Sequence, residues 1–124
     1  MDDKLDKMFD LRKQFMAALH DGNPGACLIP PVDLTNKQTQ QHMRDLALRG
    51  VEEVFESLAH IKNWKPHRVT EIKEFNQEAF KEEMVDALNY FFSLLILADV
   101  SADDLYNAYA AKDKVIHERI KNNY

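Results

Sequence analysis

The sequence predicts an all-α fold, a four-helix, bundle-like single domain that covers residues 1–124. Apolar residues recur at helical spacings of three and four along almost the whole chain, and no stretch alternates long enough to require a strand. The chain has only 3 glycines and 4 prolines, and 45% of its residues are hydrophobic, a composition that excludes a disordered chain. Its length of 124 residues is that of one domain.

The first helix is expected from about Lys4 to His20, with Asp2 or Asp3 as its N-cap. A loop rich in glycine and proline, HDGNPGACLIPPVDLT, follows and ends the helix.

The second helix is expected to begin with a capping box formed by Thr35 and Gln38, and to run to about Lys62. Gly50 lies in its middle, where glycine costs about 1 kcal/mol relative to alanine. We therefore expect close packing against a neighbouring element at Gly50.

The third helix is expected from about Glu74 to Ala98, after a break at Pro66. Its second half is apolar nearly all round, which indicates burial on two sides and association of subunits. Ser101 and Asp104 are placed to open a fourth helix that ends near Lys121.

Charge and composition narrow the functional classes. The 16 basic and 21 acidic residues give a net charge of −5, which argues against a nucleic-acid or membrane-surface binder. The single cysteine, Cys27, excludes an internal disulfide framework and fits a reducing compartment. The charged N-terminal segment and the lack of a long apolar run lead us to expect a cytoplasmic protein.

Two acidic pairs, Glu53/Glu56 and Glu83/Asp86, fall mid-helix beside apolar residues. Residues three apart share a helix face, so each pair can present two carboxylates side by side. Chance spacing produces as many such pairs in a chain this acidic, and a solvated acidic face remains the alternative. If the two pairs face each other, their mutual repulsion requires cations or protons, and an all-oxygen site suits Mg²⁺ or Mn²⁺.

The histidines and the basic residues of the fourth helix are weaker indications of a functional site than the two acidic pairs. A di-iron bundle requires a glutamate three residues before a histidine. None of the five histidines in this sequence has a glutamate at that position, which excludes such a site. Lys112 and Arg119 lie two turns apart on one face of the fourth helix, where they could bind phosphates. Cations near a helix C-terminus are also favoured by the helix dipole alone.

These motifs resemble the all-α nucleoside-triphosphate pyrophosphatases, the MazG-like superfamily, whose signature is E-x-x-E on one helix and E-x-x-D on the next. The likeness is closer to the dimeric dUTPases and the dCTPase–dUTPase of T-even phages. The NWKP segment with Trp64 and the MFDLRKQF stretch of the first helix are similar to that branch. Its tail pattern is matched at Tyr109, Lys112, Arg119 and Tyr124.

The resemblance implies hydrolysis of a dNTP, dUTP-like or dCTP-like, to dNMP and pyrophosphate. It implies that Mg²⁺ (or Mn²⁺) is held by four acids, Glu53, Glu56, Glu83 and Asp86. Glu53 or Glu56 would be catalytic, orienting or deprotonating the attacking water. The implied substrate-binding residues are Lys112, Arg119, Asp113, Tyr109, Trp64, Tyr124 and Arg12.

The sequence departs from the family at several substrate positions. Asp113 and Ile116 stand where the family has asparagines, Asn123 replaces a glycine, and Arg12 replaces a glutamine unless Gln14 serves. Because Asp113 can only accept hydrogen bonds, it suits the N1–H and N2–H₂ edge of guanine, and a purine dNTP such as dGTP is an alternative substrate.

Two further alternatives stay open at this point. Glu52 could replace Glu53 as the partner of Glu56, at i, i+4. The chain could also be a non-catalytic helical interaction protein.

The expected partners are a deoxynucleoside triphosphate and further copies of the chain, as a homodimer or homotetramer, in the cytoplasm of a bacterial or phage-infected cell.

Overall fold

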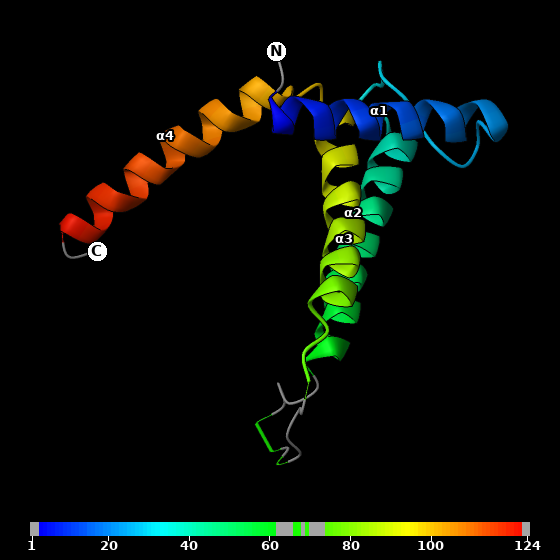
Figure 1. The fold of residues 1–124 in the computed structure, drawn as a ribbon. Helices are drawn as coiled ribbons and strands as arrows, with labels where there is room; N and C mark the ends of the chain where they lie inside the picture. The colour runs from blue at the N-terminus through cyan, green and yellow to red at the C-terminus, as the bar shows by residue number, and fades with distance from the viewer. Residues whose placement is uncertain (1–2, 62–65, 68, 70–73, 123–124) are drawn as a thin grey trace. The chain divides into compact units, whose positions relative to one another are not determined.

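The computed structural model describes residues 3–61, 66–67, 69 and 74–122. These residues form four α-helices, and no strand occurs among them: α1 (Lys4–Gly22), α2 (Lys37–Ser57), α3 (Gln77–Leu97) and α4 (Ala102–Lys121) (Figure 1). A short 3₁₀ turn, η1 (Leu58–His60), follows α2. The predicted all-α class is confirmed.

The chain divides into two compact units. The central unit comprises residues 32–94, and the terminal unit combines residues 1–31 with residues 95–124. The prediction that residues 1–124 make a single domain stays a prediction.

Within the central unit, α2 and α3 lie side by side (Figure 1). Gly50 of α2 faces Tyr90 and Phe91 of α3, and farther along α2 Glu53 approaches Glu83. Residue numbers therefore rise along α2 as they fall along the facing side of α3, so the two helices are antiparallel.

The start and the end of α2 differ from prediction. Asn36 is the N-cap, and its side-chain oxygen accepts from the backbone N–H groups of Gln38 (2.9 Å) and Thr39 (3.2 Å). The predicted Thr35/Gln38 capping box is wrong, because the Thr35 hydroxyl donates to Asp33 Oδ1 at 2.6 Å instead. The helix ends at Ser57 rather than near Lys62, since the chain tightens there into η1.

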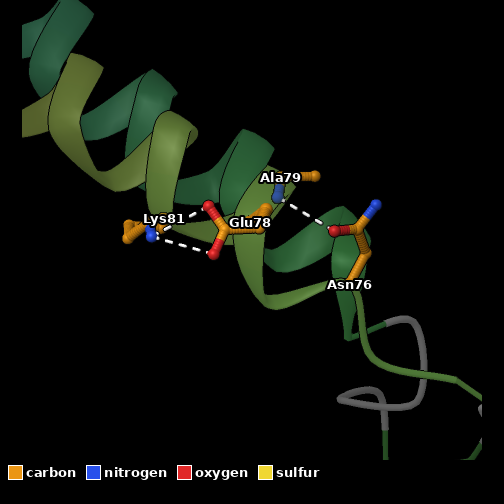
Figure 2. A network of polar contacts seen from close by, with 4 residues as sticks. All are labelled: Asn76, Glu78, Ala79 and Lys81. Carbon is orange, nitrogen blue, oxygen red and sulfur yellow. Dashed lines mark hydrogen bonds and ion pairs between the residues drawn. The ribbon is translucent and has the colours of Figure 1, made fainter.

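The first turn of α3 is fixed by two local contacts (Figure 2). Asn76 Oδ1 accepts from the Ala79 N–H at 3.1 Å, and Lys81 Nζ pairs with Glu78 Oε2 at 2.8 Å. The negative Glu78 side chain also complements the positive end of the helix dipole. Because Asn76 caps it, α3 begins at Gln77 and not at Glu74 as expected.

In the terminal unit, α1 begins as predicted with Asp3 as N-cap, whose side chain accepts from the Leu5 N–H at 3.3 Å. Its buried face carries Phe9 and Met16, each 2% exposed. The helix runs to Gly22, slightly beyond the predicted end at His20.

A short connection leads from α3 to α4. Asp99 adopts the left-handed conformation (φ 60°), and the N–H groups of Asp99 and Val100 donate to the carbonyls of Ile96 (3.0 Å) and Leu95 (2.9 Å). This pair of bonds is the Schellman motif that closes many helices. The predicted Ser101/Asp104 capping box is confirmed at the start of α4, and α4 ends at Lys121 as expected.

Among the described helices, none is individually long and apolar enough to cross a bilayer. The pair formed by α3 and α4 passes that test of length and composition only when both are counted together as a bent pair.

Candidate metal centre

Three glutamates of the central unit come together between α2 and α3. Glu53 and Glu56 project from consecutive turns of α2, and Glu83 approaches them from α3. Each offers a carboxylate oxygen, and the three oxygens lie within 4.8 Å of one another. We call these three residues the glutamate cluster.

The environment of Glu53 disfavours its negative charge. Its pKa is raised from 4.5 to about 7, first by desolvation and then by a hydrogen bond with Glu56. The negative charges of Glu56, Asp86 and Glu83 raise the same pKa further. A proton on Glu53 relieves this repulsion in the metal-free protein, and a bound cation would relieve it more completely.

Two other acids were considered for this site, Asp86 and Glu52, and the structure places both outside the glutamate cluster. Asp86 is exposed and lies outside the group of three, although its charge reaches Glu53. Glu52 is exposed and also lies outside the group. The arrangement therefore favours Glu53 over Glu52 as the partner of Glu56.

The donor set of the glutamate cluster fits a hard divalent cation. All three groups are carboxylates, and oxygen ligands of this kind suit Mg²⁺ or Mn²⁺. Neither histidine nor cysteine belongs to the cluster, so its ligands lack the nitrogen and sulfur donors typical of zinc sites.

The predicted phosphate- and base-binding residues of the tail lie on α4, in the terminal unit. Tyr109, Lys112, Asp113 and Arg119 are all exposed there. Asp113 Oδ2 lies 3.4 Å from His117 Nε2, one turn further along α4, and forms an ion pair when that histidine is protonated.

Three further predicted substrate residues remain. Arg12, on α1, places its guanidinium carbon 4.6 Å from the centre of the Phe15 ring, a cation–π contact. Trp64 and Tyr124 lie outside the described residues.

Sequence reasoning did not anticipate a cavity of about 380 Å³ in the terminal unit. Its lining combines apolar side chains such as Met16 and Ile96 with the charged residues Lys13 and Asp99. Because α1, the segment around Pro30 and the α3–α4 connection all contribute, no local pattern in the sequence could have revealed it.

Comparison with protein families relates this chain to a known group of enzymes. The family model described as dUTPase matches residues 31–124, which include α2, α3 and α4 with both acidic pairs and the tail. No curated protein and no solved structure matches the chain.

Proposed function

The chain belongs to the dUTPase family of nucleotide pyrophosphatases, and on that premise we propose that it hydrolyses a deoxynucleoside triphosphate to the monophosphate and pyrophosphate in a Mg²⁺- or Mn²⁺-dependent reaction. The substrate is of the dUTP or dCTP kind. The observation that carries this proposal is the glutamate cluster, whose three carboxylate oxygens lie within 4.8 Å of one another. Enzymes that hydrolyse phosphoanhydrides commonly use carboxylate-bound divalent cations to engage the phosphates.

Glu53, Glu56 and Glu83, with Asp86 beside them, would hold the cation. When bound, Mg²⁺ neutralises charge on the phosphoryl oxygens and makes water more acidic. Glu53 or Glu56 orients the attacking water and accepts its proton on a carboxylate oxygen. The water oxygen bonds to the α-phosphorus, the anhydride bond between the α- and β-phosphates breaks, and the β- and γ-phosphates leave as pyrophosphate.

Binding of the rest of the substrate is proposed from the family resemblance. Lys112 and Arg119 are two turns apart on one face of α4, and both carry the positive charge that phosphate oxygens require. The other proposed contacts are Tyr109, Trp64, Tyr124 and Arg12, of which Tyr109 or Trp64 stacks on the base.

Asp113 decides between a pyrimidine and a purine substrate. If its carboxylate reads the base, guanine is preferred, and Asp113→Asn should shift kcat/KM from dGTP toward dUTP and dCTP by about ten- to two-hundredfold. If Asp113 instead serves the His117 ion pair, the variant leaves the ranking of nucleotides unchanged and only alters stability. An unchanged ranking ends the idea that Asp113 reads the base and leaves the pyrophosphatase proposal standing.

The experiment that tests the function is pyrophosphate release from dUTP, dCTP, dTTP, dATP and dGTP, each with Mg²⁺ and with EDTA. We expect Mg²⁺-dependent release of one pyrophosphate for each monophosphate formed, fastest with dUTP or dCTP. Release of inorganic phosphate in place of pyrophosphate would contradict the reaction type. Absence of turnover with every nucleotide would favour a non-catalytic helical interaction protein.

A further inference from the structure

Gly50 marks a close approach of α2 to α3. The residue is buried, and a β-carbon added to it would lie 3.1 Å from two ring carbons of Phe91 and 3.3 Å from Cβ of Tyr90. The Phe91 ring can rotate away from such a methyl group. Cβ of Tyr90 cannot, because it is bonded directly to the backbone of α3. Any side chain at position 50 therefore requires the helices themselves to shift by a few tenths of an ångström.

This contact is adjacent to the glutamate cluster. Glu53 follows Gly50 by three residues, about 4.5 Å along the axis of α2. On α3, which runs antiparallel to α2, Ala87 lies about one turn from Tyr90 and Phe91 on the way to Glu83. It is only 1% exposed. The close contact at Gly50 therefore lies next to the position where Glu53 and Glu56 meet Glu83.

We propose that Gly50 is a positioning residue for the proposed cation site: its lack of a side chain holds α2 close enough to α3 for Glu53 and Glu56 to share one cation with Glu83. This inference rests on the proposed function. Glycine is unfavourable in a helix interior, so its place in the middle of α2 has a stability cost that the close approach explains.

The test is Mn²⁺ binding without nucleotide, followed by the electron paramagnetic resonance signal of the free ion. Gly50→Ala should weaken binding by about tenfold or more, as is typical when groups that orient metal ligands are disturbed. Gly50→Val, which is larger, should weaken binding further. Thermal unfolding in EDTA separates positioning from folding, because alanine favours the helix and Gly50→Ala should remain folded while its Mn²⁺ affinity falls.

A second substitution, on α3, should restore part of the Mn²⁺ affinity that Gly50→Ala loses. Phe91→Leu removes the two ring carbons that lie nearest to the new methyl group, so the Gly50→Ala/Phe91→Leu protein should bind Mn²⁺ more tightly than Gly50→Ala. This pair of variants also serves if Gly50→Ala alone fails to fold. Gly22→Ala is the matched control, since nothing lies within 4 Å of a β-carbon at position 22.

Two results would overturn the inference: Gly50→Ala that binds Mn²⁺ as tightly as the wild type, or Gly50→Ala/Phe91→Leu that binds Mn²⁺ no more tightly than Gly50→Ala. Either result leaves the proposed function intact as long as the wild type binds Mn²⁺ and releases pyrophosphate. Failure of the wild type to bind Mn²⁺ would instead remove the proposed function itself.

Discussion

Among the carboxylates of the described residues, Glu53 has a pKa far above the usual range. Its pKa of about 7 in the metal-free protein results from desolvation, the hydrogen bond with Glu56 and the negative charges around it. A divalent cation held there, as proposed, would compete with hydrogen ions for the same carboxylate near neutral pH.

The shift has a defined consequence for stability. Because the folded protein favours protonated Glu53, this residue favours folding below about pH 4.5, and its contribution is lost as the pH rises through about 7. In EDTA we expect the Tm of the wild type to fall, relative to that of Glu53→Gln, between about pH 5 and about pH 8. Thermal unfolding followed by circular dichroism measures this difference.

Glu52→Gln is the matched control, because Glu52 is the exposed neighbour outside the glutamate cluster. It should keep the pH dependence of the wild type. A Glu53→Gln protein whose Tm follows the same pH curve as the wild type would contradict the raised pKa.

Much of the candidate site follows from spacing, because residues three apart on a helix must share a face. Spacing alone could not distinguish Glu53 from Glu52, since both i+3 and i+4 partners of Glu56 are available on a helix. The answer depends on which face of α2 meets α3, and that is a tertiary property. The signal that could have settled it was Gly50, whose close approach to α3 fixes the facing side of α2.

At the scale of elements, the local capping signals predicted α4 better than α2. Ser101 and Asp104 satisfy each other's backbone groups, so the start of α4 is determined by adjacent residues. At the start of α2, Thr35 was the predicted cap, whereas the next residue, Asn36, is the cap in the structure. The contact that engages the Thr35 hydroxyl is with Asp33, outside the capping-box pattern.

The cap of α2 makes a stability prediction. Asn36→Ala should lower the free energy of unfolding by about 1 kcal/mol, because two N–H groups at the start of α2 lose their acceptor. Thr35→Ala is the control and should cost less, since its hydroxyl bonds Asp33 and no helix amide. Urea denaturation measures both, and a larger loss for Thr35→Ala than for Asn36→Ala would contradict the role of Asn36 as the cap.

At the scale of the whole molecule, large apolar side chains remain exposed on a single chain. On α2, Val51 and Phe55 are 45% and 62% exposed, and on α3, Val85 and Leu88 are 48% and 44% exposed. Helical periodicity predicts such apolar faces, but it does not specify which surface covers them.

We expect further copies of the chain to cover these faces, in a homodimer or a dimer of dimers. Light scattering coupled to size exclusion, at concentrations of tens of micromolar, should give a mass of two or four chains. Phe55→Glu, which places a charge on the apolar face of α2, should shift the population toward the monomer. A wild-type monomer at these concentrations would contradict the expectation.

The proposed activity requires that the carboxylates between α2 and α3 bind a divalent cation. Titration of Mn²⁺ into wild type, Glu83→Gln and Glu82→Gln tests it directly, with circular dichroism to verify that each protein stays helical. Glu83 belongs to the glutamate cluster, whereas the neighbouring Glu82 is exposed and lies outside it. We expect Glu83→Gln to lose Mn²⁺ binding and nearly all pyrophosphate release, and Glu82→Gln to match the wild type in both. A folded Glu83→Gln protein that binds Mn²⁺ like the wild type would contradict this expectation.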